Sequence, residues 1–209
     1  MRPLGVVDIV YGFELDAPAR SALARTDGFD HVDVLVDVDP DTLELPIGCP
    51  TAFPRPTSGW CATPAPADGP EAWDRCVEWF RTAPGALLEP WAGAVVNSAE
   101  TCIEMMAAVP GLGLLVDTGH VADWGGDPLE LLEFAGHVQL RQGAPGFTQL
   151  HVDDPNGVVD FDAILTRLDA LGSRAKLSIE YFDLPALGWP LADPRAWACD
   201  LGGQIRTLS

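Results

Sequence analysis

Four short apolar segments of the sequence end on a side chain that offers an oxygen atom as a ligand. Apolar runs of this length are typical of the buried strands of a parallel sheet. In a closed parallel barrel, the carboxyl ends of the strands converge on one small area, so residues far apart in the sequence can meet there. The sequence therefore predicts one polar site at that end of a barrel. Its members are Glu89, Asp117, Gln139 and Glu180.

This set of ligands favours a particular kind of metal and reaction. Three carboxylates and one amide suit a hard or borderline cation, so we expect Mn²⁺ first and Mg²⁺ second. Such an ion can hold the two vicinal oxygens of a hydroxy-ketone and can stabilise the enediolate that forms when a carbon-bound proton is removed. Carboxylates beside the ion can carry that proton.

Two cationic or neutral donors accompany the acids. His120 follows Asp117 by three positions, within the run Asp117-Thr118-Gly119-His120, and is expected to donate a hydrogen bond to a substrate oxygen. Arg141 lies two residues beyond Gln139, on the same side of a strand because side chains alternate with a period of two. It could bind a substrate carboxylate or phosphate, or it could pair with the surrounding acids. His137 is expected to be structural.

The elements that would position these residues alternate along the chain. β-Branched and apolar runs predict strands, and apolar residues at helical spacing predict the helices between them. Strands alternating with helices at this pace indicate a parallel sheet with helices outside it. We expect strands at 4–10, 31–38, 86–89, 112–117, 137–140 and 177–181, and helices at 17–25, 71–80, 98–109, 127–135 and 160–171.

One region lacks this regularity. Residues 39–70 are rich in proline and keep no helical period, so they predict loop with short strands near 45–48 and 59–62. We expect one barrel helix to be missing here. The fold class is therefore α/β, a shortened parallel barrel of the TIM-barrel type that forms a single domain over residues 1–209.

Several blocks of this sequence resemble the xylose isomerase-like barrel superfamily, the group of sugar phosphate isomerases and epimerases. The similarity is carried by residues 114–120 through 128, 137–142, 157–161 and 178–181, with a weaker echo in 20–33. It covers roughly residues 5–38 and 84–185 and leaves the proline-rich segment unmatched.

The resemblance implies roles for individual residues. Glu89 and Glu180 would be the acid/base pair and metal ligands, Asp117 and Gln139 would complete the metal shell, and His120 would contact the substrate. Many family members have His where this chain has Gln139, whereas hydroxypyruvate isomerases are similar to it in having Gln. The departure weakens nitrogen ligation of a metal but does not abolish the site.

Composition narrows the choice of partners. The chain has 31 acidic and 12 basic residues, a net charge of −19, and this field repels nucleic acid and anionic membranes. Five widely spaced cysteines without a CxxC pair predict reduced thiols. With no recognisable signal peptide, we expect a cytoplasmic protein that acts on a small molecule, with a homodimer covering the flank where a helix is missing.

The sequence thus predicts a metal-dependent isomerase or epimerase of a small hydroxy-ketone or sugar-like substrate. Two alternatives remain open at this stage. A lyase or dehydratase would begin with the same proton abstraction next to a carbonyl, and a non-catalytic barrel would bind a small ligand without turnover. The DNA-binding endonuclease branch of the superfamily is disfavoured, because the chain has four histidines and a strongly negative charge.

Overall fold

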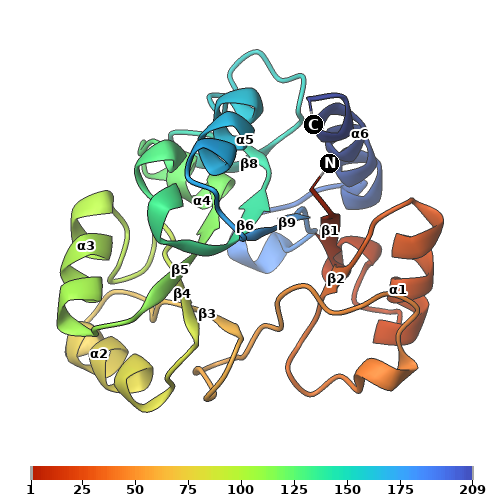
Figure 1. The fold of residues 1–209 in the computed structure, drawn as a ribbon. Coiled ribbons are helices and arrows are strands. Elements are labelled where there is room, and N and C mark those ends of the chain that lie inside the picture. Colours follow the sequence, from red (N-terminus) through yellow and green to blue (C-terminus); the bar gives the residue numbers. More distant parts are fainter. Residues whose placement is uncertain (1, 209) are drawn as a thin grey trace.

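A parallel sheet with helices around it forms the centre of the protein in a computed structural model, which describes residues 2–208 (Figure 1). Seven strands pair in the order β2-β1-β9-β6-β5-β4-β3, and every pairing is parallel. The strands are β1 (Leu4–Val7), β2 (Val32–Asp33), β3 (Ala62–Pro64), β4 (Leu87–Glu89), β5 (Gly113–Asp117), β6 (Ala135–Leu140) and β9 (Lys176–Ile179).

An extended segment, residues 46–52, joins the two edges of this sheet. Its backbone pairs on one side with β2 and the residues after it, through the bridges Val32–Ile47 and Leu35–Thr51, and on the other side with Ala62 of β3. The backbone hydrogen bonds from Gly48 N to Val32 O and from Ala62 N to Pro50 O are both 2.8 Å long. The segment thus occupies the place of a strand between β2 and β3 and continues the curvature of the sheet.

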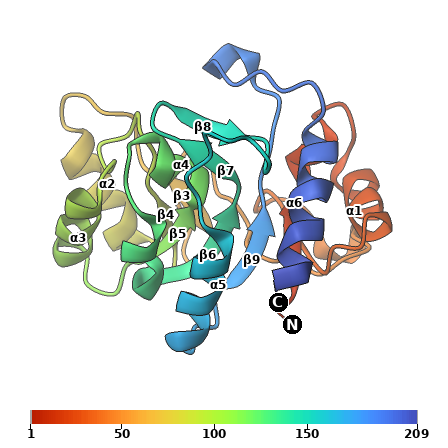
Figure 2. The same ribbon diagram turned by 90° about the horizontal axis from the view of Figure 1, so that it is seen from above.

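Helices surround the strands on the outside (Figures 1 and 2). They bury apolar side chains against the sheet, as in α5, where Phe161, Ile164, Leu165 and Leu168 are buried at helical spacing. The helices are α1 (Ala17–Thr26), α2 (Ala72–Thr82), α3 (Ala99–Ala108), α4 (Thr118–Asp123), α5 (Phe161–Ala170) and α6 (Pro194–Leu208). No helix within residues 2–208 is both long and apolar enough to cross a membrane.

Several elements confirm the sequence analysis. The predicted helices near 17–25, 71–80, 98–109 and 160–171 correspond to α1, α2, α3 and α5. Helix α3 begins after Ser98, whose side chain accepts a hydrogen bond from Thr101 N in a capping box. Between residues 39 and 70, which are all described, the only helical element is the 3-10 turn Pro40–Thr42, so the barrel helix expected to be missing is absent.

Other elements differ from the prediction. The strand expected over 31–38 pairs as a strand only at Val32–Asp33, and beyond it the pairing continues only through the isolated bridge Leu35–Thr51. The helix expected over 127–135 consists of the two 3-10 turns Pro128–Glu130 and Leu132–Phe134. The antiparallel hairpin of β7 (Gln142–Ala144) and β8 (Phe147–Leu150), and helix α6, were not predicted.

The interior of the barrel is layered, because alternate residues of each strand point inward. One inward-facing layer is a small apolar cluster of Cys49, Ala62, Leu87 and Leu115. Beside it, His137 Nε2 lies 2.7 Å from Asp33 Oδ2, and both side chains are fully buried. This pairing supports the expectation that His137 is structural. The next inward residues along β4, β5 and β6 are Glu89, Asp117 and Gln139.

Candidate metal and proton-transfer site

The strand register brings the predicted site residues to one level of the barrel. Asp117 at the end of β5 pairs directly with Gln139 of β6, and Glu89 at the end of β4 pairs with Pro64 of β3. Glu180 directly follows β9, and its backbone N donates to Leu140 O at 3.2 Å. All four side chains are buried at this level.

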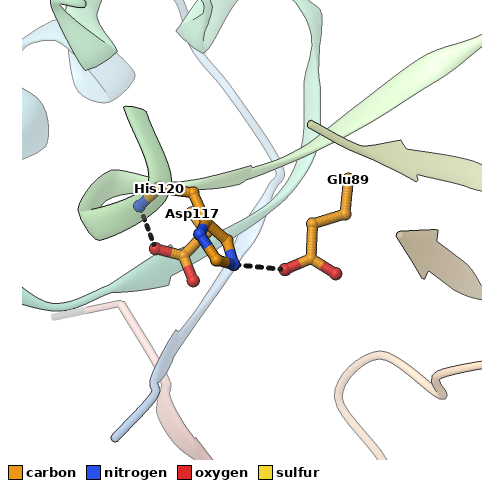
Figure 3. Close-up of side chains that lie close together, drawn as sticks. All are labelled: Glu89, Asp117 and His120. Carbon is orange, nitrogen blue, oxygen red and sulfur yellow. Dashed lines mark hydrogen bonds and ion pairs between the residues drawn. The ribbon is translucent and has the colours of Figure 1, made fainter. Parts of the chain in front are cut away.

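Glu89, Asp117 and His120 form the tightest group (Figure 3). One potential ligand atom from each residue lies within 4.8 Å of the other two, which is a spacing that could hold a metal ion. His120 Nε2 is 3.7 Å from Glu89 Oε1, and the backbone N of His120 donates to Asp117 Oδ1 at 3.1 Å. Asp117 therefore caps the short helix α4 and so fixes the position of the imidazole.

Arg141 lies behind this group, not in the wall of the pocket. Its Nε donates to Asp117 Oδ1 at 3.0 Å, its NH2 donates to Asp117 Oδ2 at 2.5 Å, and the same NH2 is 3.2 Å from Glu180 Oε2. Of the two roles left open by the sequence, the structure shows the pairing with the surrounding acids. No spacing rule could identify Asp117 as the partner, because the two residues are 24 positions apart.

The charges in the site shift the ionisation of its members. Burial raises the pKa of Glu89 to about 8, and the charge of Asp117 adds to this effect. The pKa of Glu180 is raised well above its usual value for the same leading reason. Burial also opposes ionisation of Asp117, but Arg141 outweighs it and lowers the pKa of that carboxyl to about 2. Burial lowers the pKa of His120 to about 3, so its imidazole is neutral.

Some polar atoms of the site have no hydrogen-bond partner among residues 2–208. They include His120 Nδ1 and Gln139 Oε1, both buried. Buried polar atoms normally find a partner, so the unpaired Gln139 oxygen calls for a cation or a donor from a ligand. The carboxylate and amide oxygens of the site are ligand types that Mn²⁺ and Mg²⁺ accept. The residues present therefore fit a divalent ion.

A cavity of about 410 Å³ opens above these groups. Its polar lining consists of Thr51, Glu89, His120, Gln139 and Glu180, and its apolar lining consists of Phe53, Pro64, Trp91, Phe182 and Trp189. Thr51 and Phe53 come from the proline-rich region, which therefore shapes the pocket. Trp91 lines the cavity, whereas Trp124 packs against the core and Trp60 donates to Gly48 O.

Aromatic side chains in the lining were not identified from the sequence. Phe182 and Trp189 lie with ring centroids 5.4 Å apart, and Trp189 lies 5.8 Å from the His120 ring. Phe182 is two residues beyond Glu180, so the period-two rule that linked Arg141 to Gln139 could have found it. Trp189 belongs to a loop after β9, and its place at the pocket depends on the course of that loop.

Fold and site together define a parallel α/β barrel with an acidic site at the carboxyl ends of its strands. The chain belongs to the xylose isomerase-like TIM barrel family, whose model matches residues 57–200. No curated protein matches the sequence significantly.

Several solved structures share the fold. An L-ribulose 3-epimerase structure is 17% identical, with a TM-score of 0.71, over 100% of this chain and 96% of the other. A D-allulose 3-epimerase from Methylomonas sp. is 15% identical, with a TM-score of 0.72, over 100% and 98%. A xylose isomerase-like TIM barrel protein from Mycobacterium smegmatis, solved in complex with magnesium, is 12% identical, with a TM-score of 0.70, over 100% and 97%.

Proposed function

We propose that the protein is a divalent-metal-dependent isomerase or epimerase of a small, neutral hydroxy-ketone or sugar. The observation that carries this proposal is the convergence of two buried carboxyl groups, Glu89 and Glu180, on one cavity. The fold shared with two 3-epimerases of sugars supports the same class of reaction. Mn²⁺ is the preferred ion and Mg²⁺ the second choice, held by Glu89, Asp117, Gln139 and Glu180, with His120 within reach of the same position.

The lining of the cavity argues for a neutral substrate. Among the described residues that line it, none is Lys or Arg, and the nearest guanidinium, that of Arg141, is already paired with Asp117. A phosphate or carboxylate would therefore enter a pocket that offers it carboxyl groups and no free cation. Aromatic faces such as Trp91 suit the C–H face of a sugar.

The residues themselves can carry out a proton transfer. One of the two glutamates removes the proton from the carbon next to the carbonyl, and the electron pair moves into the adjoining carbonyl to form an enediolate. The other glutamate returns a proton to carbon, either on the opposite face or at the neighbouring position. His120 Nε2 or the Gln139 amide can donate to a substrate oxygen. A divalent cation, when bound, would supply a Lewis acid beside the enediolate oxygens.

The proposal is tested by solvent exchange. Wild-type protein with Mn²⁺ is incubated in D₂O with unphosphorylated ketoses and, in parallel, with their phosphate esters. We expect deuterium to enter the position next to the carbonyl of a neutral ketose. The isosteric change Glu180→Gln should lower this rate by about 10²–10⁴-fold, the usual contribution of a general acid or base. Glu133→Gln, at an exposed position, is the control.

Two results would contradict the proposal. Exchange that persists in Glu180→Gln removes Glu180 from proton transfer. Absence of exchange with every neutral ketose, in protein that binds Mn²⁺, leaves the non-catalytic barrel as the better explanation.

A further inference from the structure

The side chain of Arg141 occupies a space that the surrounding chain leaves for it. Thr118 Oγ1 donates to Arg141 O at 2.7 Å and accepts from Arg141 N at 2.9 Å, which fixes the backbone on both sides of the residue. A methyl group on Gly119 would lie 2.1 Å from Thr148 O and 2.6 Å from Arg141 Cγ, so only glycine leaves room there. The Phe182 ring covers the guanidinium, with Arg141 Cζ 4.8 Å from the ring centroid.

This guanidinium links the ends of three neighbouring strands. Arg141 follows β6, Asp117 ends β5 and Glu180 follows β9, and these strands are adjacent in the sheet. Arg141 is 0% exposed. Two of its nitrogen atoms donate to Asp117, and one of them also forms an ion pair with Glu180. A buried charge of this kind is expensive unless it is paired. The ion pairs of Arg141 are therefore part of the buried structure of the site and not an incidental surface interaction.

The charges of the buried groups determine what else the site can hold. A carboxyl group must lose its proton to bind a metal. With a metal bound, Glu89, Asp117 and Glu180 would therefore carry three negative charges, and Arg141 carries one positive charge. The remaining two negative charges match a single divalent cation. A second divalent cation would leave an excess of positive charge in a buried space, which is unfavourable.

We infer that Arg141 is an internal cation of this site: a positioning residue that holds Asp117 and Glu180 and takes the place of part of the positive charge that a metal would otherwise supply. The inference rests on the metal site of the proposed function but concerns the apparent metal affinity and the number of ions, not the substrate. Removal of the guanidinium charge should therefore strengthen metal binding, although it removes hydrogen bonds from the ligands.

The test is the variant Arg141→Met, which keeps much of the side-chain length and removes the charge. Mn²⁺ is titrated into wild-type and variant protein, and free Mn²⁺ is followed by its electron paramagnetic resonance signal, which gives the Kd and the number of bound ions. Like charges repel more strongly in a buried site than in water, so the loss of the guanidinium charge beside the ligands should favour a bound cation. We expect Mn²⁺ to bind at least tenfold more tightly to Arg141→Met.

Two further variants separate charge from geometry. Arg141→Lys keeps the positive charge but cannot grip Asp117 with two nitrogens, so its Kd for Mn²⁺ should stay within about threefold of wild type. Arg195→Met is the matched control, because Arg195 also grips an aspartate with two nitrogens, Nε and NH2 to Asp27 at 2.8 and 2.7 Å, away from the site. It should leave Mn²⁺ binding unchanged.

The pattern of results decides the inference. Tighter binding in Arg141→Met, together with a lower kcat in Mn²⁺-loaded protein, supports it, because a merely structural loss would weaken both. Binding by Arg141→Met where wild type binds no Mn²⁺ also supports it, while it contradicts the metal dependence of the proposed function. Unchanged or weaker binding in Arg141→Met overturns it. If that variant does not fold, Arg141→Gln, which is also neutral, replaces it under the same criteria.

Discussion

Glu89 makes the stability of the metal-free protein depend on pH. Its pKa is raised from 4.5 to about 8 in the folded state, so between these values the folded protein binds more protons than the unfolded chain. Stability therefore falls as the pH rises through that window. Glu89→Gln remains neutral throughout, and at pH 8.5 it should be more stable than wild type by roughly 4–5 kcal/mol, or about 10–20 °C in Tm.

Thermal unfolding in EDTA at pH 5 and pH 8.5 checks this prediction. At pH 5 the two proteins should unfold at similar temperatures, because Glu89 is then protonated in the folded state. Saturating Mn²⁺ should reverse the order at pH 8.5, since the carboxylate would then be a ligand. Equal Tm values at both pH values without metal would show that Glu89 ionises freely in the folded protein.

The sequence predicted candidate site residues only where a local rule applied. Glu89, Asp117, Gln139 and Glu180 each end a short apolar run, and the parallel register then places them at one level. The pairing of Arg141 with Asp117 depends on two strands lying side by side, which no local pattern specifies. The same holds for the cavity lining from the loops, such as Trp189 and Phe53.

Among the elements, the extended segment 46–52 closes the barrel and depends on one glycine. A methyl group on Gly48 would lie 2.1 Å from His31 Cδ2 and 2.3 Å from Asp33 Oδ1. Both neighbours are buried, and Asp33 is held by His137, so neither can move freely. Gly48→Ala should therefore destabilise the protein by about 1–3 kcal/mol, the usual cost of overpacking.

Chemical denaturation measures this effect, with Gly203→Ala as the control. Gly203 lies in α6, and among the described residues nothing lies within 4 Å of a methyl group placed there. Alanine in a helix is favoured over glycine by roughly 0.5–1 kcal/mol, so the control should gain stability. A neutral Gly48→Ala would mean that the segment 46–52 is not held against β2 in solution.

Helices were predicted correctly where apolar periodicity and capping residues agreed. Elements were missed where their structure depends on contacts with other parts of the chain. Helices α2 and α5 have clear apolar stripes and were predicted. Helix α6 buries Ala198, Leu201, Gly202 and Ile205, but its two adjacent glycines weaken the helical signal. The segment 46–52 has too many prolines to resemble a strand, and its role follows from partners on both sides.

At the scale of the whole molecule, a net charge of −19 on 209 residues opposes the compact state through self-repulsion. At about 0.01 M ionic strength the screening length is about 30 Å, and at about 0.15 M it is about 8 Å. Salt should therefore stabilise the protein: raising NaCl over this range should increase the Tm of the metal-free protein by a few degrees. Choline chloride should have the same effect, because screening does not depend on the identity of the cation.

The same experiment separates general screening from the buried site. Mn²⁺ at micromolar concentration adds almost nothing to the ionic strength, so any rise in Tm that it causes must come from binding to the folded state. This rise should saturate, should persist at 0.15 M NaCl, and should be smaller in Asp117→Ala than in wild type. A Tm that does not respond to NaCl would contradict the self-repulsion argument. A Mn²⁺ effect that salt abolishes would assign the ion to the acidic surface instead of the barrel.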